Sequence, residues 1–302
     1  MSAQIIDGKE IAREIQDELG VRIKALTEKG TPPGLAVVLV GENPASLSYV
    51  TAKERDCEKV GIRSFDHHLS AATGEDELVA LVDSLNADAS VHGILVQLPL
   101  PDHIDSDRIL QRIAPEKDVD GFHPLSLGKM LTGLPTLLPC TPHGVVQMLL
   151  RSGHDPAGKH VVILGRSNIV GKPLANLLAL KQKGGNATVT ICHSRTPDIG
   201  AMTRQADILV AAIGVAEFVR ADMVKNGAVV IDVGVNRVDD PSRKKGYRLV
   251  GDVNFEGVST KASAITPVPG GVGPMTRTML LFNTVAAAEA ISAQKTGESH
   301  GS

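Results

Sequence analysis

The chain lacks tryptophan, and aromatic residues make up only 2% of its 302 residues. Proteins that bind nucleic acid without sequence preference combine a basic groove along the phosphates with aromatic side chains that stack on bases. Here the net charge is −3, and lysine and arginine are mixed along the chain with aspartate and glutamate. We therefore expect no nucleic acid partner.

Other absences narrow the class of protein further. No apolar run approaches the ~20 residues that cross a bilayer, and the first ten residues lack the features of a secretory signal. The three cysteines, Cys57, Cys140 and Cys192, are far apart and outside any C-x-x-C pair, as expected for buried thiols in a reducing compartment. The ten histidines show no metal-binding spacing. We expect a cytoplasmic protein that neither contacts a membrane nor holds a catalytic metal.

The length and the apolar runs predict the architecture. A chain of this length exceeds what one hydrophobic core usually serves, so we expect two domains around a cleft. Asp7 begins a capping-box pattern before a helix with apolar residues at spacings of three and four. The runs Ala36–Val40 and Val91–Gln97 predict strands buried on both faces, as in a parallel sheet. Between them, Asn43 with a proline after it predicts the start of a helix.

From residue 160 the pattern begins again. Short β-rich runs alternate with helix-length segments, the runs being 160–165, 187–191, 208–213 and 228–233. The chain is therefore expected to be α/β, with two α/β domains, the second a Rossmann-type dinucleotide-binding domain. A further helix is expected over 277–292, and residues 293–302 are expected to form a flexible tail.

The first strand of this second domain ends in a glycine turn. Gly165 follows the strand, Arg166 and Ser167 come next, and Val170 and Gly171 precede a helix-like segment. Such a turn lets backbone N–H groups and the helix dipole meet a pyrophosphate. The match to G-x-G-x-x-G is imperfect, because Ser167 replaces the second glycine and Gly171 falls one place late. A plain strand-to-helix turn remains the alternative for these residues taken alone.

The end of the next strand indicates which dinucleotide is bound. Roughly 25 residues after the turn, where an NAD site places an acid against the ribose 2′-hydroxyl, the chain has Ser194 and Arg195. With Arg166, these residues offer charge-assisted hydrogen bonds to a ribose 2′-phosphate, which favours NADP. Residues after the following strands are further candidates, although ordinary turn glycines explain them equally well: Ala212, Gly214, Val233, Gly234 and Val235.

In the first domain, Tyr49 and Lys53 lie one turn apart on the same face of the expected helix. Alone, Lys53 would be interpreted as a solvated surface lysine. Residues 41–53 (GENPASLSYVTAK), however, resemble the bifunctional methylenetetrahydrofolate dehydrogenase/methenyltetrahydrofolate cyclohydrolase family. The resemblance continues in order through GILVQLPLP (93–101), PEKDVDGFHP (115–124), PCTP (139–142), the Arg166 turn and PVPGGVGPMT (267–276). Leu125-Ser126 departs from it, since an asparagine would be expected there.

The resemblance implies roles for particular residues. Lys53 would be the acid/base group, Gln97 its hydrogen-bond partner, Asp120 the anchor of the pterin and Tyr49 a stacking surface for the folate. A carboxylate can accept two parallel N–H bonds from the amino-pyrimidinone edge, whereas a turn carboxylate is the ordinary alternative for Asp120. Further substrate contacts are expected from Ser46, Leu98, Pro99, Pro269, Gly270 and Gly271, and further cofactor contacts from Val170 and Thr276.

The resemblance also implies the domain organisation. A folate-binding catalytic domain would occupy residues 1–142 and be completed by the helix 277–292, and the NADP-binding domain would occupy 143–276. The segment Pro267–Pro274 is expected to be too stiff and too bare for a regular helix or strand. Either Leu98–Pro99 or Val268–Pro269 is expected to be a cis peptide.

A homodimer with two activities follows from this resemblance. It would oxidise 5,10-methylenetetrahydrofolate to 5,10-methenyltetrahydrofolate with NADP and then hydrolyse the product to 10-formyltetrahydrofolate. One alternative is a dehydrogenase without the hydrolytic activity, which would most simply lack Lys53. Another is a non-catalytic NADP-sensing protein, against which the set Tyr49, Lys53, Gln97 and Asp120 argues.

Overall fold

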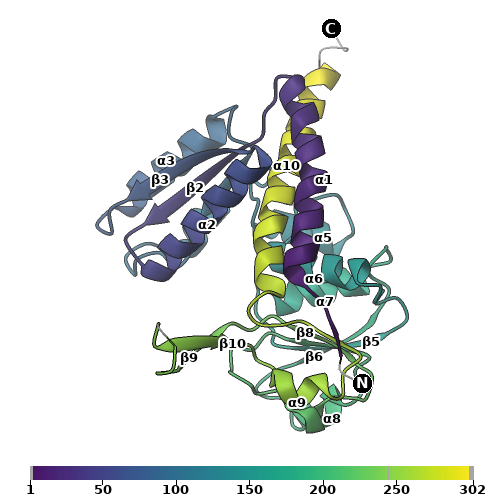
Figure 1. Ribbon diagram of the computed structural model, residues 1–302. Coiled ribbons are helices and arrows are strands. Elements are labelled where there is room, and N and C mark those ends of the chain that lie inside the picture. Colours follow the sequence, from purple (N-terminus) through teal and green to yellow (C-terminus); the bar gives the residue numbers. More distant parts are fainter. Residues whose placement is uncertain (1–2, 244, 299–302) are drawn as a thin grey trace. The chain divides into compact units, whose positions relative to one another are not determined.

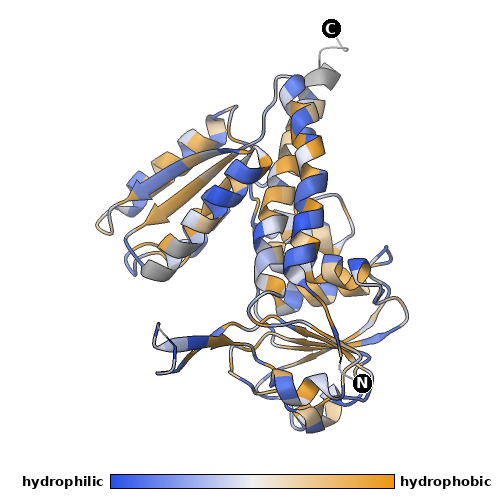
Figure 2. Cartoon of the chain, viewed as in Figure 1, coloured by the Kyte–Doolittle hydropathy of each residue, from blue (hydrophilic) through white to orange (hydrophobic). Residues whose placement is uncertain are grey.

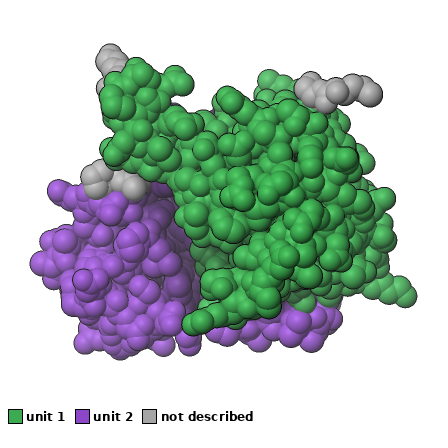
Figure 3. Space-filling model, turned by 90° about the horizontal axis from the view of Figure 1, so that it is seen from below, with its two compact units in different colours: residues 1–13, 141–276 green, residues 14–140, 277–302 purple. Residues whose placement is uncertain are grey.

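The computed structural model describes residues 3–243 and 245–298, and the chain divides into two compact units. Unit 1 consists of Met1–Arg13 and Thr141–Thr276, and unit 2 consists of Glu14–Cys140 and Arg277–Ser302 (Figure 3). Two long helices, α1 (Gly8–Glu28) and α10 (Val272–Glu298), each contribute residues to both units. The α/β class expected from the sequence is confirmed.

Unit 2 is built on a three-stranded parallel sheet in the order β3-β2-β4, of which Figure 1 labels β2 and β3. The three strands are β2 (Gly34–Val40), β3 (Arg63–Leu69) and β4 (Gly93–Val96). The helices that lie wholly in this unit are α2 (Pro44–Val60), α3 (Glu75–Ala87), α4 (Ser106–Arg112) and α5 (Pro124–Leu131). Every residue of β2 is buried, as its apolar run predicts for a central strand. The edge strand β3 is not indicated by the sequence, because its residues RSFDHHL mix charged and apolar side chains.

Side-chain caps define where two helices of the chain begin. Asn43 Oδ1 accepts a hydrogen bond from Ser46 N at 3.3 Å, which confirms the expected start of α2. Asp7 Oδ1 accepts from Lys9 N at 2.8 Å at the start of α1. Within unit 2, α1 and α10 lie side by side, because Arg22 Nη2 is 2.7 Å from Glu289 Oε2 and its guanidinium lies 4.9 Å from the centre of the Phe282 ring.

Unit 1 contains a six-stranded sheet in the order β1-β11-β8-β7-β5-β6, in which all pairings are parallel. The strands are β1 (Gln4–Ile5), β5 (His160–Leu164), β6 (Thr188–Cys192), β7 (Ile208–Ala211), β8 (Val229–Asp232) and β11 (Ala264–Ile265). The helices are α6 (Cys140–Arg151), α7 (Gly171–Ala179), α8 (Ile199–Thr203), α9 (Phe255–Ser259) and the 3₁₀ helix η1 (Ala221–Met223), and β9 (Asn236–Asp239) pairs antiparallel with β10 (Tyr247–Val250). The central strands β7 (ILVA) and β8 (VVID) are buried along their length and are apolar except for Asp232 at the end of β8 (Figure 2).

The order of this sheet creates a topological switch point. Strand β5 pairs with β6 on one side and with β7 on the other. The connection from β5 to β6 therefore runs toward one edge of the sheet, and the connection from β6 to β7 runs back toward the other edge. In open α/β sheets, ligands bind outside the carboxyl ends of the strands at such a point. We therefore expect a dinucleotide site at the carboxyl ends of β5, β6 and β7.

Three expected boundaries differ from the structure. The resemblance places residues 1–13 in the first domain, but β1 pairs in parallel with β11 and so belongs to the sheet of unit 1. The segment Pro267–Pro274 is expected to lie outside regular structure, but helix α10 begins within it, at Val272. Pro274 is tolerated because it lies in the first turn of the helix, where backbone N–H groups have no helical acceptor. The same helix continues to Glu298, so residues 293–298 are helical and not a flexible tail, and 299–302 lie outside the described residues.

No helix within residues 3–243 and 245–298 combines the length and the apolar character that crossing a membrane requires.

Candidate active site

In unit 2, the structure brings Lys53 and Gln97 together. Lys53 lies in the middle of α2, and Gln97 is the first residue after β4, where its backbone N–H donates to Val38 O at 2.9 Å. Lys53 Nζ donates to Gln97 Oε1 at 3.0 Å, and Gln97 Nε2 donates to Leu98 O at 2.7 Å. The amide of Gln97 is thus fixed from both ends, and its oxygen faces the lysine. Leu98 precedes a cis proline, and Val268–Pro269 is also cis, as expected.

The carboxylate of Asp120 supplies the charge beside this lysine. Burial lowers the pKa of Lys53, while the negative charge of Asp120 acts in the opposite direction and the positive charge of Arg277 adds to the lowering. Burial likewise raises the pKa of the Asp120 carboxyl, and Lys53 opposes that rise. A lysine with a lowered pKa beside a half-buried carboxylate is able to exchange protons closer to neutral pH than a free lysine.

The loop that carries Asp120 is held by its backbone and by the helix α10. Asn283 Nδ2 donates to Val119 O and to Leu138 O, both at 2.8 Å. Gly121 adopts a φ of +75°, and a Cβ there would meet the backbone of Leu138 and Pro139. Glycine is therefore required directly after Asp120. These contacts fix the position of a residue that neither a helix nor a strand contains.

Some residues near Lys53 escaped the sequence interpretation. Arg277 Nε lies 2.8 Å from Asp56 Oδ2, so an ion pair joins α10 to the helix that carries the lysine. Asp118 is 3% exposed and accepts a hydrogen bond from His123 N at 2.7 Å, and burial raises the pKa of its carboxyl to about 6. Asp56 follows Lys53 by three residues on one helix, which was a usable signal, whereas nothing local in the sequence marks Arg277.

The residues expected to contact the substrate are distributed over both units. Tyr49 is 51% exposed on α2, Leu98 is 37% exposed, and Pro99 is exposed, whereas Ser46 is buried. Pro269, Gly270 and Gly271 belong to unit 1, where a Cβ on Gly8 would meet the carbonyl of Gly271. Gly8 therefore allows a close approach of two backbone segments of unit 1, and contacts of Pro269, Gly270 and Gly271 with the substrate stay a prediction.

Unit 1 has a pocket of about 420 Å³ at the carboxyl edge of its sheet. Its lining comes from the ends of β5, β6 and β7 and the segments that follow them: Leu164, Gly165, Arg166, Ser167, Cys192, His193, Ser194, Ile199, Ala212, Ile213, Val215 and Phe218. Five of the expected cofactor residues line it, namely Gly165, Arg166, Ser167, Ser194 and Ala212. The other seven, which do not belong to this lining, are Val170, Arg195, Gly214, Val233, Gly234, Val235 and Thr276.

Close backbone contacts shape this pocket. Gly165 has a φ of +113°, and a Cβ there would meet the carbonyl of Ala212 at the end of β7. A Cβ on Gly171 would meet the carbonyl of Gly165, so the start of α7 packs directly against the end of β5. Gly171 therefore serves the packing role of the last glycine in a dinucleotide fingerprint, even though it falls one place late. Ser167 Oγ accepts from Val170 N at 3.1 Å and closes the turn.

Two buried carboxylates that the sequence interpretation missed hold the next loops of unit 1. Asp232, at the end of β8, and Asp252, after β10, are 3% and 0% exposed. Asp252 Oδ2 accepts from Ile213 N at 2.7 Å and from Gly214 N at 3.0 Å. The sequence draws attention to Gly234, two residues after Asp232, and not to Asp232 itself, because aspartate next to glycine is common in ordinary turns.

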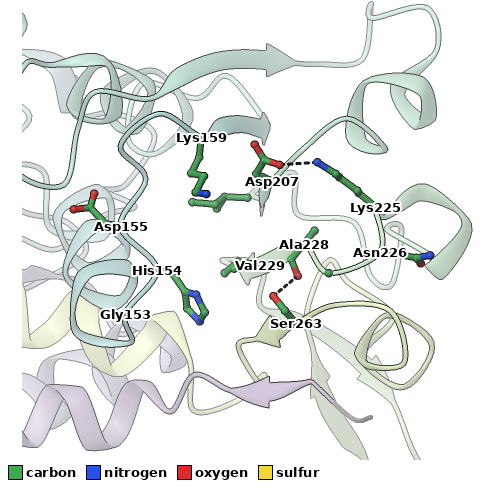
Figure 4. Close-up of a pocket in the computed structure, with 12 residues that line it drawn as sticks. Gly153, His154, Asp155, Lys159, Asp207, Lys225, Asn226, Ala228, Val229 and Ser263 are labelled. Atoms are coloured by element: carbon green, nitrogen blue, oxygen red, sulfur yellow. Dashed lines mark hydrogen bonds and ion pairs between the residues drawn. The ribbon is translucent and has the colours of Figure 1, made fainter.

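A second pocket of unit 1, of about 440 Å³, lies at the opposite edge of the sheet (Figure 4). It is lined by residues that precede β5, β7, β8 and β11, among them Lys159, Asp207, Ala228 and Ser263. Lys225 Nζ donates to Asp207 Oδ1 at 2.6 Å there. None of the expected site residues lines this pocket, and ligands of open α/β sheets bind at the carboxyl edge. The pocket at the carboxyl edge is therefore the candidate dinucleotide site.

The fold and the dinucleotide pocket define a class of protein, an α/β dehydrogenase in which a dinucleotide-binding unit is joined to a second α/β unit. The family model "Tetrahydrofolate dehydrogenase/cyclohydrolase, catalytic domain" matches residues 6–120, and that for the NAD(P)-binding domain matches 139–292. The chain belongs to the tetrahydrofolate dehydrogenase/cyclohydrolase family.

Relatives match nearly the whole chain. The "Bifunctional protein FolD" of Salinibacter ruber is 59% identical over 286 residues, which cover 95% of this chain and 96% of that protein. The crystal structure of the bifunctional dehydrogenase/cyclohydrolase from Campylobacter jejuni has a TM-score of 0.90 at 50% identity and covers 96% of this chain and 99% of its own. The Trypanosoma brucei enzyme, solved with NADP cofactor and inhibitor, has a TM-score of 0.90 at 42% identity over 96% of this chain and 98% of its own.

Proposed function

We propose that this protein oxidises 5,10-methylenetetrahydrofolate to 5,10-methenyltetrahydrofolate with NADP and hydrolyses the product to 10-formyltetrahydrofolate, with Lys53 as the proton-transfer group. The observation that carries the proposal is the hydrogen bond of 3.0 Å between Lys53 Nζ and Gln97 Oε1, with the carboxylate of Asp120 acting on the same ammonium. The dinucleotide pocket of unit 1 supplies the other requirement of the reaction.

The oxidation needs positioning more than it needs protein acids and bases. NADP supplies a nicotinamide ring that accepts a hydride from the methylene bridge of the substrate. The two substrate nitrogens that flank the bridge stabilise the cation that remains, so no protein base is required. The residues of the chain contribute by orienting the folate and the dinucleotide, an effect that supplies ~7–11 kcal/mol in well-aligned reactions.

The hydrolysis needs three proton transfers. Water adds to the cationic methenyl carbon and loses a proton, and one ring nitrogen takes up a proton as its bond to that carbon breaks. The hydroxyl proton of the adduct leaves to solvent as the formyl C=O forms, so one proton is released overall. The neutral amine of Lys53 accepts the first proton, and the resulting ammonium returns one to the nitrogen. Burial lowers the pKa of Lys53 and so makes the amine available, while Gln97 fixes the amine without adding a charge.

The pocket of unit 1 fits NADP. Gly165 and Gly171 let the ends of β5 and β7 pack closely against the start of α7, and the N-terminus of a helix at such a turn offers N–H groups to a pyrophosphate. Arg166 and Ser194 line the same pocket, and none of its described lining residues is an aspartate or glutamate. An arginine in place of the usual acid favours a ribose 2′-phosphate.

For the remaining expected roles, Asp120 would bind the amino-pyrimidinone edge of the pterin and Tyr49 would stack on the folate. We also propose a homodimer, on the strength of the family resemblance. A cytoplasmic location is compatible with the three cysteines, which are all free and buried. Light scattering on the purified protein tests the assembly, and the monomer mass of 31.7 kDa would contradict a dimer.

Two assays on the purified chain test the function itself. NADPH formation from 5,10-methylenetetrahydrofolate reports the oxidation, and the decay of 5,10-methenyltetrahydrofolate above its spontaneous rate reports the hydrolysis. We expect both activities. NADPH formation without hydrolysis would indicate a monofunctional dehydrogenase, and NADP binding without either reaction would indicate a sensing protein.

A further inference from the structure

A chain of buried hydrogen bonds in unit 1 leads from β8 to the wall of the dinucleotide pocket. It begins at Asp232, whose Oδ1 accepts from Gly234 N at 3.0 Å and from Asp252 N at 2.9 Å. Its Oδ2 accepts from Val253 N at 2.9 Å, and its own N–H donates to Thr266 Oγ1 at 2.7 Å. Asp232 thus fixes the backbone on both sides of the Asp252 side chain.

Asp252 extends this chain to two further segments. Its Oδ2 accepts the N–H groups of both Ile213 and Gly214, and its Oδ1 accepts from Asn236 Nδ2 at 2.9 Å. Ile213 lines the dinucleotide pocket directly after β7. A single carboxylate therefore ties the pocket wall to the beginning of β9.

The surroundings leave little space for an alternative arrangement. A Cβ on Gly234 would meet the carboxylate of Asp252, and a Cβ on Gly251 would meet that of Asp232. Burying two carboxylates beside one another is unfavourable unless their oxygens are hydrogen-bonded, and here each carboxylate accepts from three donors.

We propose that Asp252, itself held by Asp232, is a positioning residue for NADP: its carboxylate fixes the N–H groups of Ile213 and Gly214, and with them the segment through which Ile213 lines the dinucleotide pocket. Asp252 touches the pocket wall and not the reacting atoms. Without the carboxylate, the loop after β7 would relax, and the complementary surface for the dinucleotide would have to be reformed at each binding event. This inference rests on the proposed use of NADP.

Removal and conservative replacement of this carboxylate test the role. Asp252→Ala removes the acceptor for Ile213 N, Gly214 N and Asn236 Nδ2. In Asp252→Asn, the amide oxygen still accepts from the two peptides, and its NH₂ group donates to Asn236 Oδ1 once the Asn236 amide has turned over. We expect Asp252→Ala to weaken NADP binding at least about tenfold, as measured by calorimetry. We expect Asp252→Asn to bind within about threefold of the unmodified protein.

Asp207→Ala is the matched control in the same unit. Asp207 Oδ2 accepts from His160 N at 3.0 Å and Oδ1 pairs with Lys225, so it too is a carboxylate that holds backbone, but at the opposite edge of the sheet (Figure 4). Asp207→Ala should lose stability, but its dissociation constant for NADP should stay within about twofold of that of the unmodified protein. The midpoint of thermal unfolding, measured for every variant, separates a loss of stability from a loss of binding.

The outcomes are distinct. If the unmodified chain does not bind NADP, the proposed function fails, whereas tight binding by both the unmodified chain and Asp252→Ala overturns the positioning role alone. Binding by Asp252→Asn that is as poor as that of Asp252→Ala also overturns it, because the retained hydrogen bonds would then be irrelevant. Should Asp252→Ala fail to fold, Asn236→Asp decides, since it places a second carboxylate against Asp252 at a half-exposed position. We expect it to weaken binding about fivefold or more, and unchanged binding refutes the role.

Discussion

The two units build their sites from different parts of the chain. In unit 1, backbone forms the critical surfaces, because Gly165 and Gly171 bring the ends of β5 and β7 and the start of α7 into contact. In unit 2, the site consists of the side chains of Lys53 and Gln97, joined by a hydrogen bond, and the nearby carboxylate of Asp120. A phosphate-bearing ligand is recognised by N–H groups that every residue except proline has, whereas proton transfer requires particular titrating groups. The activities should therefore be separable by mutation, one unit at a time.

The largest expected effect is in unit 2. Lys53→Met removes the proton-transfer group and keeps most of the length of the side chain, so hydrolysis of methenyltetrahydrofolate should fall ~10²–10⁴-fold, the usual contribution of general acid–base catalysis. NADP binding, measured by calorimetry, should stay unchanged because the dinucleotide pocket is formed by unit 1. Dehydrogenase activity should fall by a smaller factor, since hydride transfer needs no proton relay. Hydrolysis at the unmodified rate by folded Lys53→Met protein would disprove the assignment.

The reciprocal test is in unit 1. Arg166→Ala removes the guanidinium from the pocket, and the KM for NADP should rise about 10–100-fold, as expected for the loss of hydrogen bonds to a charged group. The KM for NAD, which lacks the 2′-phosphate, should change much less. Steady-state kinetics with both cofactors measure the difference, and Lys172→Ala, at a neighbouring exposed position, is the control. An equal rise in the KM for both cofactors would mean that Arg166 does not recognise the 2′-phosphate. A fall in the rate of hydrolysis would contradict the expectation that the two activities can be separated by mutation.

A smaller effect should follow from a change of charge next to Lys53. Gln97→Glu places a carboxylate within hydrogen-bonding distance of the amine, and a negative charge favours the ammonium, so the pKa of Lys53 should rise. The rising limb of the pH profile of hydrolysis should move about one unit or more toward high pH, with about a tenfold loss near neutral pH. Gln97→Ala loses the hydrogen bond without adding charge, and its profile should be lower without being displaced. Identical profiles for the two variants would show that Lys53 does not act as the base.

The same contrast explains how much the sequence revealed. The buried strands and the glycine turn are predictable because their signals are local, a run of apolar residues or glycines next to a strand. Lys53, Gln97 and Asp120 stand out only through motifs of a family, since their proximity depends on the fold. Asp252 escaped notice because its partners Ile213 and Gly214 are distant in sequence. Likewise β1, two residues long, shows no pattern, and only its pairing with β11 places residues 1–13 in unit 1.

The smallest expected effect concerns stability, and its sign differs between two aspartates of unit 2. Burial raises the pKa of Asp118 from its ordinary 3.8 to about 6. Between these values the folded chain binds more protons than the unfolded chain, so this group's contribution to stability falls as pH rises from about 4 to 6 and stays low above that. Asp118→Asn keeps an oxygen for His123 N and removes the titration, so its unfolding midpoint relative to the unmodified protein should increase from pH 4 to pH 7.

Asp88 provides the opposite case, because hydrogen bonds from Ser90 lower the pKa of its carboxyl. The stability that this group contributes is present above its ordinary pKa and is lost as pH falls through the lowered value. Asp88→Asn should therefore be less stable than the unmodified protein at pH 7 and should approach it in acid, the reverse of Asp118→Asn.

For Asp118, a pKa shift of about two units corresponds to at most ~3 kcal/mol in the free energy of unfolding, or several degrees in the midpoint of thermal unfolding. Thermal unfolding followed by circular dichroism at several pH values measures both differences. Midpoints of Asp118→Asn that run parallel to those of the unmodified protein would show that the buried carboxyl does not titrate in this range, and the loop before Asp120 would then be held by an ionised group.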